Sequence, residues 1–286
     1  AAPPPLRPPP ASSTLNHMRI ATWNINSVRT RAQRAVDLLA KHDIDVLCLQ
    51  ETKVADAKFP REPFEEAGYH VTCHGLNQWN GVAILSKEEP EEVQTFFPAQ
   101  PGFHKDPAKE QKREARAVSA RIRGIEIWSL YVPNGREITD RHFDYKLDFL
   151  YSLARYVETR AQSKLLLTGD FNIAPRDEDV WDISLFRGKT HVTEPERAAF
   201  QMLQEAGLQE VTRRFTEEER WTYFDYKSLR FQKNEGMRID FQLASEPLAR
   251  LVQGAQVDMV ERAGDKTSDH VPLIAEFDVP DFASVR

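Results

Sequence analysis

The stretch Leu165-Leu166-Leu167-Thr168-Gly169-Asp170-Phe171-Asn172 decides how the rest of this chain is interpreted. Its opening residues form a short apolar run that is typical of a β-strand buried on both faces. An acid, Asp170, follows this run after Thr168 and Gly169, and Asn172 lies two positions further on. Because side chains two positions apart in an extended segment point to the same side, both polar groups face the same way. The stretch therefore predicts a buried strand that ends in a reactive carboxylate.

Two other apolar runs meet polar side chains in a similar way. Gln50 and Glu51 directly follow the apolar run 46–49, and Asp269 and His270 directly precede an apolar run near the C-terminus. A strand end is a place where a rigid sheet holds reactive groups in fixed positions. Cleavage of a phosphodiester needs an attacking water, relief of charge on the phosphoryl oxygens and stabilisation of the leaving oxygen. These strand ends together favour a phosphodiester-cleaving site built around one divalent metal ion.

Strand and helix patterns alternate along the chain, and no internal repeat is present. Hairpin-like pairs are mixed with helical crossovers, and the glycine fingerprint of dinucleotide-binding proteins is absent after the first strand, so a purely parallel Rossmann sheet is disfavoured. We therefore expect an α/β fold of the layered sandwich type. Strands are expected at residues 19–23, 46–49, 69–73, 82–85, 118–122, 125–132, 165–168, 237–243, 256–260 and 271–277. Helices are expected from the N-cap Ser27 to His42, at 143–156 and at 198–206.

The composition is that of an ordinary soluble globular protein, because 41% of the 286 residues are hydrophobic and 29% are charged. No apolar run reaches the roughly 20 residues that a transmembrane helix needs, and the N-terminus lacks the layout of a secretion signal. Cys48 and Cys73 lie in apolar β-like runs, which favours buried thiols over a disulfide or a metal site. We expect a cytoplasmic protein with no membrane partner, and a monomer because nothing indicates obligate oligomerisation.

The net charge of −6 disfavours a nonspecific nucleic-acid coat protein, which would be basic overall. It does not exclude a DNA enzyme, since local basic patches make the phosphate contacts. One segment, 103–116, is rich in basic residues and is either a phosphate-gripping loop or an ordinary solvated loop. Its basic residues are Lys105, Lys109, Lys112, Arg113 and Arg116.

Residues 1–17 differ in composition from the rest of the chain. They consist mostly of Pro and Ala followed by a short Ser/Thr run, and such a segment has no means of burying apolar surface. We expect a disordered Pro-rich tail, either native or an added remnant, followed by a single catalytic domain over residues 18–286.

Each polar candidate also has an ordinary structural explanation. Asn24 and Asn134 follow apolar runs, but Asn is common in turns at strand ends. Glu51 is more unusual, because Glu directly after a buried strand is rarely left unpaired. Mg²⁺ prefers oxygen ligands and often takes only one or two carboxylates, so Glu51 is a good metal candidate. Lys53 either pairs with such a carboxylate or is simply solvated.

Asp240 lies inside an otherwise apolar run, where a buried acid needs a partner, and His270 is a natural one. A lone His is more often structural than catalytic. The order of the candidates along the chain is far more specific than any one of them. That order is Asn24, Glu51, Tyr131 with Asn134, Asp170 with Asn172, Asp240, and then Asp269 with His270.

These residues and their surroundings resemble the exonuclease III family of abasic-site DNA endonucleases, within the endonuclease/exonuclease/phosphatase superfamily. The resemblance covers nearly everything from Met18 to Val279, and the segment Trp221–Asp240 narrows it to the abasic-site enzymes. The matching motifs are Ile20–Arg29, Leu49–Lys53, Asn80–Ala83, Gly169–Pro175, Gly236–Asp240 and Ser268–His270.

The resemblance implies a four-layer, DNase I-like sandwich of two packed mixed β-sheets with helices outside. It also implies hydrolysis of the phosphodiester 5′ to an abasic site in duplex DNA, with Mg²⁺ as cofactor and Mn²⁺ as a substitute. Exonuclease activity in the 3′→5′ direction and removal of 3′-blocking groups often accompany this activity in the family.

The resemblance also implies roles for the catalytic candidates. Asp170 would orient or deprotonate the attacking water, with Asn172 holding that water in place. His270, supported by Asp240, would bind the scissile phosphate and stabilise its developing charge.

By the same resemblance, Glu51 would ligate the metal, with Asn24 and Asp269 nearby. Tyr131 and Asn134 would contact the phosphate. Some family members carry an acid at the position of Asn26, so a metal contact there would be weaker in this chain.

A further part of the resemblance concerns substrate binding. The segment Trp221–Tyr226 matches a loop that lines the pocket for the flipped-out abasic sugar, so Phe224 and Met237 are expected as apolar walls of that pocket. Core packing is the alternative for this aromatic run. Relatives carry Trp or Leu at the position of Met237, which keeps the pocket apolar but alters its shape. Arg116 is expected to contact a phosphate.

Two other functions compete with the abasic-site endonuclease. A phosphatase acting on inositol phosphates or phospholipids would share the superfamily's catalytic residues, and the segment 221–240 argues against it. A DNA-damage-binding protein with impaired catalysis would not need the complete set of Glu51, Asp170, Asp240 and His270.

Overall fold

The computed structural model describes residues 17–280, which form two six-stranded β-sheets. In the order of their pairing, the strands of the first sheet are β11 (Val252–Val257), β12 (Leu273–Asp278), β1 (His17–Asn24), β2 (Val46–Gln50), β4 (Val82–Ser86) and β3 (His70–His74). Those of the second sheet are β5 (Glu91–Gln94), β6 (Ala117–Ile122), β7 (Ile125–Tyr131), β8 (Leu165–Asp170), β10 (Asp240–Ser245) and β9 (Leu208–Glu210).

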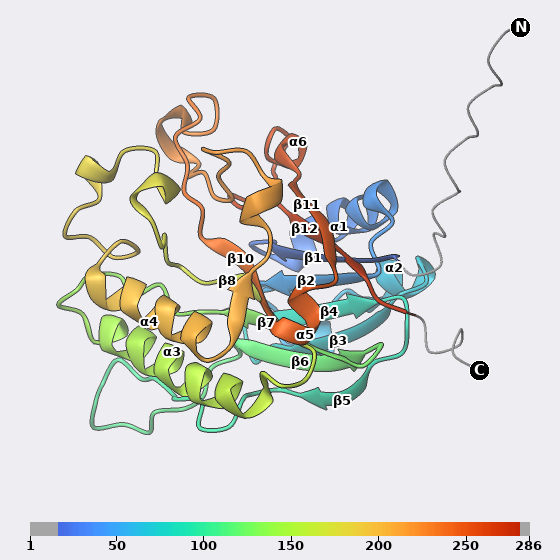
Figure 1. Ribbon diagram of the computed structural model, residues 1–286, viewed down its shortest axis with the longest axis horizontal. Helices are drawn as coiled ribbons and strands as arrows, with labels where there is room; N and C mark the ends of the chain where they lie inside the picture. Colours follow the sequence, from blue (N-terminus) through green and yellow to red (C-terminus); the bar gives the residue numbers. More distant parts are fainter. Residues whose placement is uncertain (1–16, 281–286) are drawn as a thin grey trace, which may run out of the picture.

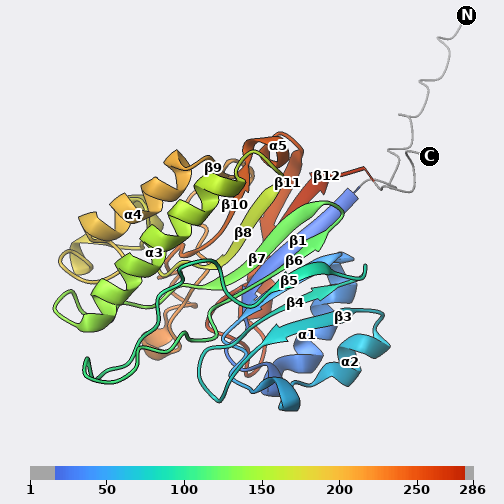
Figure 2. The ribbon, with the colours of Figure 1, turned by 90° about the horizontal axis from the view of Figure 1, so that it is seen from below.

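The two sheets pack face to face between two layers of helices (Figures 1 and 2). One outer layer consists of α1 (Val28–His42) and α2 (Arg61–Glu66), and the other of α3 (Arg141–Arg160) and α4 (Glu194–Glu205). Two short helices, α5 (Glu246–Ala249) and α6 (Met259–Arg262), follow β10 and β11. The expected four-layer α/β sandwich is thus confirmed.

The central strands are almost entirely apolar because both of their faces are covered. In β2, Val46 and Cys48 face the core between the sheets, whereas Leu47 and Leu49 face the core under α1. In β8, Leu166 faces the core between the sheets. Side chains alternate between the two faces of a strand, so a strand buried on both sides must be apolar at every position.

Each sheet contains one parallel pair, β1 with β2 and β7 with β8, and its other pairs are antiparallel. The carboxyl ends of both parallel pairs lie at the same edge of the sandwich, because Asn24 at the end of β1 reaches Asp170 at the end of β8. The antiparallel strand β10 starts at this edge, and so does β12. The carboxyl ends of β1, β2, β7 and β8 and the starts of β10 and β12 therefore come together in space.

Several expected boundaries are wrong. The strand expected at 237–243 starts only at Asp240, because Met237 instead bridges to Tyr223 in a loop. The strand expected at 256–260 is β11, which ends at Val257, and α6 follows with Asp258 as its N-cap. Helices α3 and α4 are longer than expected, and α2, α5, α6, β5 and β9 were not anticipated.

Some smaller expectations also differ. Ser27 is the N-cap of α1, but its side chain makes no capping hydrogen bond. His17 was assigned to the tail and instead begins β1; residues 1–16 and 281–286 lie outside the described residues. Both cysteines are free thiols, Cys48 buried as expected and Cys73 only partly so. Across residues 17–280, no helix combines the length and apolar character needed to cross a membrane.

Candidate active site

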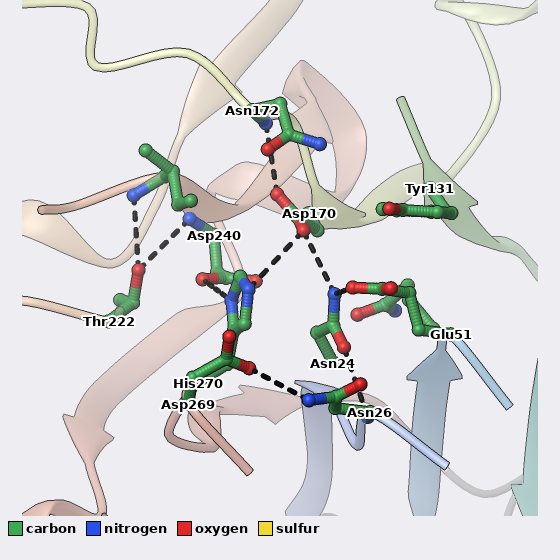
Figure 3. Close-up of polar contacts among 12 residues, drawn as sticks. Asn24, Asn26, Glu51, Tyr131, Asp170, Asn172, Thr222, Asp240, Asp269 and His270 are labelled. Carbon is green, nitrogen blue, oxygen red and sulfur yellow. Dashed lines mark hydrogen bonds and ion pairs between the residues drawn. The ribbon is translucent and has the colours of Figure 1, made fainter. Parts of the chain in front are cut away.

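The candidate active site lies where the ends of β1, β2, β7 and β8 meet the loop before β12 (Figure 3). Gly169 makes the approach of β8 to β7 possible, because a Cβ at this position would lie 2.0 Å from the carbonyl oxygen of Leu130. The backbone of Gly169 has φ +148°, which side chains rarely allow. This close approach sets the position of the neighbouring Asp170 beside Tyr131, its parallel partner.

Asp170, Asp240 and His270 form the buried centre of the site, each at most 4% exposed. The Nδ1 atom of His270 lies 2.8 Å from Asp240 Oδ2, and its Nε2 atom lies 3.5 Å from Asp170 Oδ2. Asp240 is held from the other side, since its backbone N–H donates to the hydroxyl of Thr222 at 3.1 Å. These contacts bring together three of the predicted catalytic residues.

Asn24 links this centre to the second carboxylate. Its Nδ2 atom donates to Glu51 Oε2 at 2.5 Å and to Asp170 Oδ2 at 3.0 Å. Lys53 pairs with a carboxylate, which was one of the two possibilities that the sequence left open. Its Nζ atom lies 3.7 Å from Glu51 Oε1 and 2.6 Å from Asn26 Oδ1. The first strand end is therefore part of the site.

Burial and neighbouring charges determine the protonation of this centre. Burial raises the pKa of Asp170 to about 7, with Asp240 and Glu51 adding to the rise and His270 opposing it. Burial alone would lower the pKa of His270, but Asp240 and Asp170 outweigh it and raise that pKa well above its ordinary value. A proton-accepting carboxylate thus lies beside a cationic imidazole.

The donor atoms of the site fit a hard divalent cation. Carboxylate oxygens of Glu51 and Asp170 and a ring nitrogen of His270 lie within 4.8 Å of one another, and the two carboxylates are the metal donors here because a protonated imidazole has no free lone pair. Carboxylate oxygens are the donors that Mg²⁺ prefers, and one or two carboxylates are enough for it. Asp269 is not in this group: its Oδ1 atom lies 3.5 Å from Asn26 Nδ2, and its side chain lines the same cavity.

Tyr131, Asn134 and Asn172 also line the cavity. Asn172 is fixed by its side chain, whose Nδ2 atom donates to Val132 O at 2.8 Å, and by its backbone N–H, which donates to Asp170 Oδ1 at 3.0 Å. Burial and the nearby Glu51 raise the pKa of Tyr131 far above its usual range. Its phenol therefore stays protonated and is available as a donor.

The cavity over this centre has a volume of about 1100 Å³. Its lining includes Met237, as expected, and several residues that the sequence analysis missed. They are Tyr223, Ile239, Trp181 and His191. Tyr223 packs against His270 with ring centroids 5.0 Å apart, and His191 Nε2 lies 3.2 Å from Asn172 Oδ1.

Phe224 is not a wall of this cavity, so that expectation is wrong. Its side chain is fully buried and packs edge-on against Phe231 at 5.1 Å, whereas the preceding Tyr223 faces the cavity. Neighbouring residues in an extended segment point to opposite sides, so an error of one position exchanges core and cavity. Ile239 could have been predicted as a cavity wall, because it lies two positions after Met237 and side chains at this spacing in an extended segment point to the same side.

Arg116 is also not available as a phosphate contact. Its guanidinium is buried, its Nε atom lies 2.9 Å from Glu114 Oε1, and its Nη1 atom donates to Tyr131 O at 3.3 Å. It also covers the ring of Tyr131, with its Cζ atom 4.8 Å from the ring centroid. Arg116 therefore helps to hold Tyr131 in place through contacts with its backbone carbonyl and its ring.

The other basic side chains of segment 103–116 are exposed, and none lines the cavity. The backbone of this segment is tied to α3, because Arg141 Nη1 donates to the carbonyls of His104 and Lys105 at 2.7 and 2.9 Å. A phosphate-gripping role for these residues remains a prediction.

Comparisons with known proteins agree with this arrangement. The chain matches the model of the endonuclease/exonuclease/phosphatase family over residues 21–270. It is 34% identical over 275 residues to exodeoxyribonuclease III of Haemophilus influenzae, a match that covers 91% of this chain and 100% of that protein. Two solved structures are also similar. An AP endonuclease from Archaeoglobus fulgidus has a TM-score of 0.84 and 36% identity, over 92% of this chain and 100% of that one. The 3′ phosphatase NExo from Neisseria, bound to product DNA hairpin, has a TM-score of 0.85 and 35% identity, over 91% of this chain and 99% of that one.

Proposed function

This chain belongs to the endonuclease/exonuclease/phosphatase family, and on that premise we propose that it is a DNA repair nuclease of the exodeoxyribonuclease III type. Its main reaction is the hydrolysis of the phosphodiester 5′ to an abasic site in duplex DNA, with Mg²⁺ as cofactor and Mn²⁺ as a possible replacement. The observation that carries this proposal is the convergence of Asp170, His270 and Glu51 at the floor of one cavity.

Asp170 orients the attacking water and accepts its proton. With a pKa near 7, its carboxylate can both hold and release a proton close to neutral pH, which is what a general base needs. Asn172 is fixed beside it by its bond to Val132 and limits where that water can lie.

His270 binds the scissile phosphate as a cation and stabilises the charge that develops there. Asp240 fixes the orientation of the ring through the Nδ1 contact, so Nε2 is the nitrogen that faces the reaction. Tyr131 donates a hydrogen bond from its phenol to a phosphoryl oxygen, and Asn134 donates one from its side-chain amide. Fixed donors aimed at developing charge are worth far more in a buried site than in water.

Glu51 is the carboxylate that we assign to the metal, with Asn24 beside it. When bound, Mg²⁺ supplies positive charge that stabilises the phosphoryl oxygens as negative charge grows on them.

The abasic sugar fits between Met237, Tyr223 and Ile239, which are among the apolar residues that line the cavity. A residue without a base costs less to extrude from the stack than a complete nucleotide. A cavity with apolar walls beside the catalytic centre therefore favours a substrate that lacks a base.

Reactions at 3′ ends form the second candidate function. The similarity to a 3′ phosphatase captured with a DNA product supports removal of 3′-blocking groups, and 3′→5′ exonuclease activity is the related reaction on unmodified ends. All three reactions hydrolyse a phosphoester of DNA and need the same Asp170 and His270.

The deciding experiment compares three labelled duplexes with Mg²⁺ and with excess chelator: one with a single abasic site, one with a 3′-phosphate and one with an unmodified recessed 3′ end. A metal-dependent cut 5′ to the abasic site supports the main proposal. Reaction at the 3′ ends alone would replace it with the second candidate. Binding of the abasic duplex without cleavage would indicate a damage-binding protein, and faster turnover of an inositol phosphate would indicate a phosphatase.

A further inference from the structure

Lys146 is a fully buried cation on α3 that the proposed reaction does not use. Its Nζ atom donates to three acceptors: Asn172 O at 2.5 Å, Glu196 Oε1 at 2.6 Å and Asn134 O at 3.1 Å. A buried lysine is rare unless it is paired, and one ion pair with Glu196 would satisfy that need. The two backbone carbonyls are the unusual partners.

Those carbonyls belong to the two loops that carry polar groups of the site. Asn134 lies three positions after the end of β7, and Asn172 lies two positions after the end of β8. We propose that Lys146 is a positioning residue for the reaction: its ammonium holds the backbones of Asn134 and Asn172 at a fixed separation. The inference rests on the proposed function, because it assumes that Asn134 contacts the scissile phosphate and that Asn172 limits the position of the attacking water.

A third loop is tied to the same cation through Glu196. The Oε1 atom of Glu196 accepts from Thr190 Oγ1 at 2.6 Å, and its Oε2 atom accepts from Thr193 Oγ1 at 2.8 Å. The same hydroxyl oxygen of Thr190 lies 3.1 Å from Asn134 O. One buried pair therefore joins the loop after β7, the loop after β8 and the segment that leads into α4.

His191, which follows Thr190, extends this link back to the cavity through its contact with Asn172 Oδ1. Burial lowers the pKa of His191 to about 3, and the charge of Lys146 adds to that effect, so this imidazole stays neutral. The closeness of the loops is also visible at Gly135, where a Cβ would lie 2.9 Å from Thr190 Oγ1 and 3.0 Å from Lys146 Cδ.

A purely structural pair and a positioning pair give different mutational results. Replacing a whole buried ion pair by apolar side chains of similar size is often neutral for stability, whereas removing one partner is not. The double variant Lys146→Met/Glu196→Met should therefore fold, with a melting temperature lowered by the loss of the hydrogen bonds that the pair makes to the loops and to Thr193 at the start of α4. It has no donor for the two carbonyls, so the loops lose their common anchor.

The test measures kcat and KM on the abasic duplex together with hydrogen exchange of the loops. In the double variant, kcat should fall about 100-fold with little change in KM, because a displacement of about 1 Å at reacting groups has an effect of this size. Amide exchange should become faster at residues 132–136 and 171–174 and stay unchanged in β1 and β2.

Lys146→Arg is the second variant. It keeps the charge opposite Glu196 and thus the fold, but a planar guanidinium does not replace a point-like ammonium that serves two carbonyls. We expect kcat to fall about 10-fold with the protein still folded.

Glu126→Gln is the matched control. Glu126 is a buried carboxylate that accepts from Trp128, Tyr156 and Arg160, but it lies at the far end of β7 from the site. This variant should lower the melting temperature and leave kcat unchanged.

A folded Lys146 variant with wild-type kcat would overturn the inference. So would a loss of kcat without faster exchange in those two loops. If the wild type cleaves none of the substrates, the proposed function fails, and hydrogen exchange still decides whether Lys146 anchors the loops.

Discussion

Asp240 and Asp170 are directly paired across the antiparallel strands β10 and β8, and the ring of His270 lies between their carboxylates. Directly opposed residues of an antiparallel pair project from the same face, which brings the two acids close together. Two buried carboxylates repel each other unless a cation lies with them. The cationic His270 meets that need and presents its second nitrogen to the cavity.

Asp170→Asn should retain binding of abasic duplex and lose most cleavage. The amide keeps the shape of the side chain but cannot accept the proton of water, and acid–base groups contribute roughly 10²–10⁴-fold. Single-turnover cleavage and fluorescence anisotropy measure the two properties separately. Near-normal turnover by this variant would remove Asp170 from its assigned role.

Asp240→Asn and His270→Ala should not have additive effects. Each variant should lower cleavage by about 10²-fold or more, because the first releases the ring and the second removes its charge. The double variant should be little worse than His270→Ala alone, since residues that act as one unit are not additive. Independent, multiplying losses in this mutant cycle would show that Asp240 acts separately from His270.

Removal of the metal should abolish cleavage, and Glu51→Gln should raise the Mg²⁺ concentration needed for half-maximal rate. An amide oxygen is a weaker ligand for a hard cation than a carboxylate. The measurement is a Mg²⁺ titration of cleavage after treatment with chelator. An unchanged Mg²⁺ dependence would argue against Glu51 as a ligand, and activity in excess chelator would contradict the cofactor assignment.

Tyr223→Ala and Phe224→Ala should separate function from stability. Phe224 is fully buried, so its truncation should lower the free energy of unfolding by about 3–5 kcal/mol. Tyr223 lies against His270 and lines the cavity, so its truncation should mainly reduce cleavage. Urea unfolding and cleavage rates of both variants test this contrast, and the reverse pattern would restore Phe224 as the cavity wall.

Asp258 should contribute to stability in a pH-dependent way. Its carboxylate contacts Lys41 and His42 at 2.8 and 2.7 Å and caps α6. These hydrogen bonds outweigh the effect of burial, which alone would raise the pKa, so the pKa of Asp258 is held below 3.8 in the folded protein. A depressed acid stabilises the fold above its unfolded pKa, and this contribution is lost as the pH falls through the folded pKa.

Asp258→Asn should accordingly lower the free energy of unfolding by about 1–2 kcal/mol near neutral pH, because an amide can still cap but has no charge. The difference from the wild type should stay constant down to about pH 5 and shrink below about pH 4. Urea unfolding of both proteins across this range measures it. A difference in unfolding free energy that grows as the pH falls would contradict a lowered pKa for Asp258.

The sequence alone determined the layered fold and most of the site. Apolar strands such as 46–49 and 165–168 must be covered on both faces, which indicates a layered fold, and the resemblance to the exonuclease III family implied its form of two sheets between two helix layers. Polar groups at the ends of such strands converge wherever parallel strands end at a common edge. Asp170 and Glu51 were accessible to sequence reasoning for this reason, whereas Asp240 and His270, at the start of β10 and just before the start of β12, both antiparallel strands, were recognised as a buried acid and its natural partner.

Only the tertiary structure decided which side chains face the cavity and which are enclosed. Tyr223 and Phe224 are neighbouring aromatic residues, and their order along the chain does not fix the direction of a loop segment. Arg116 had the composition of a phosphate contact, but Glu114 engages it behind Tyr131. Lys146 looked like an ordinary residue of a helix, and it lies at the junction of three loops. Local sequence patterns report the period of an element, whereas burial and partners depend on segments that are distant in the chain and meet only in the folded protein.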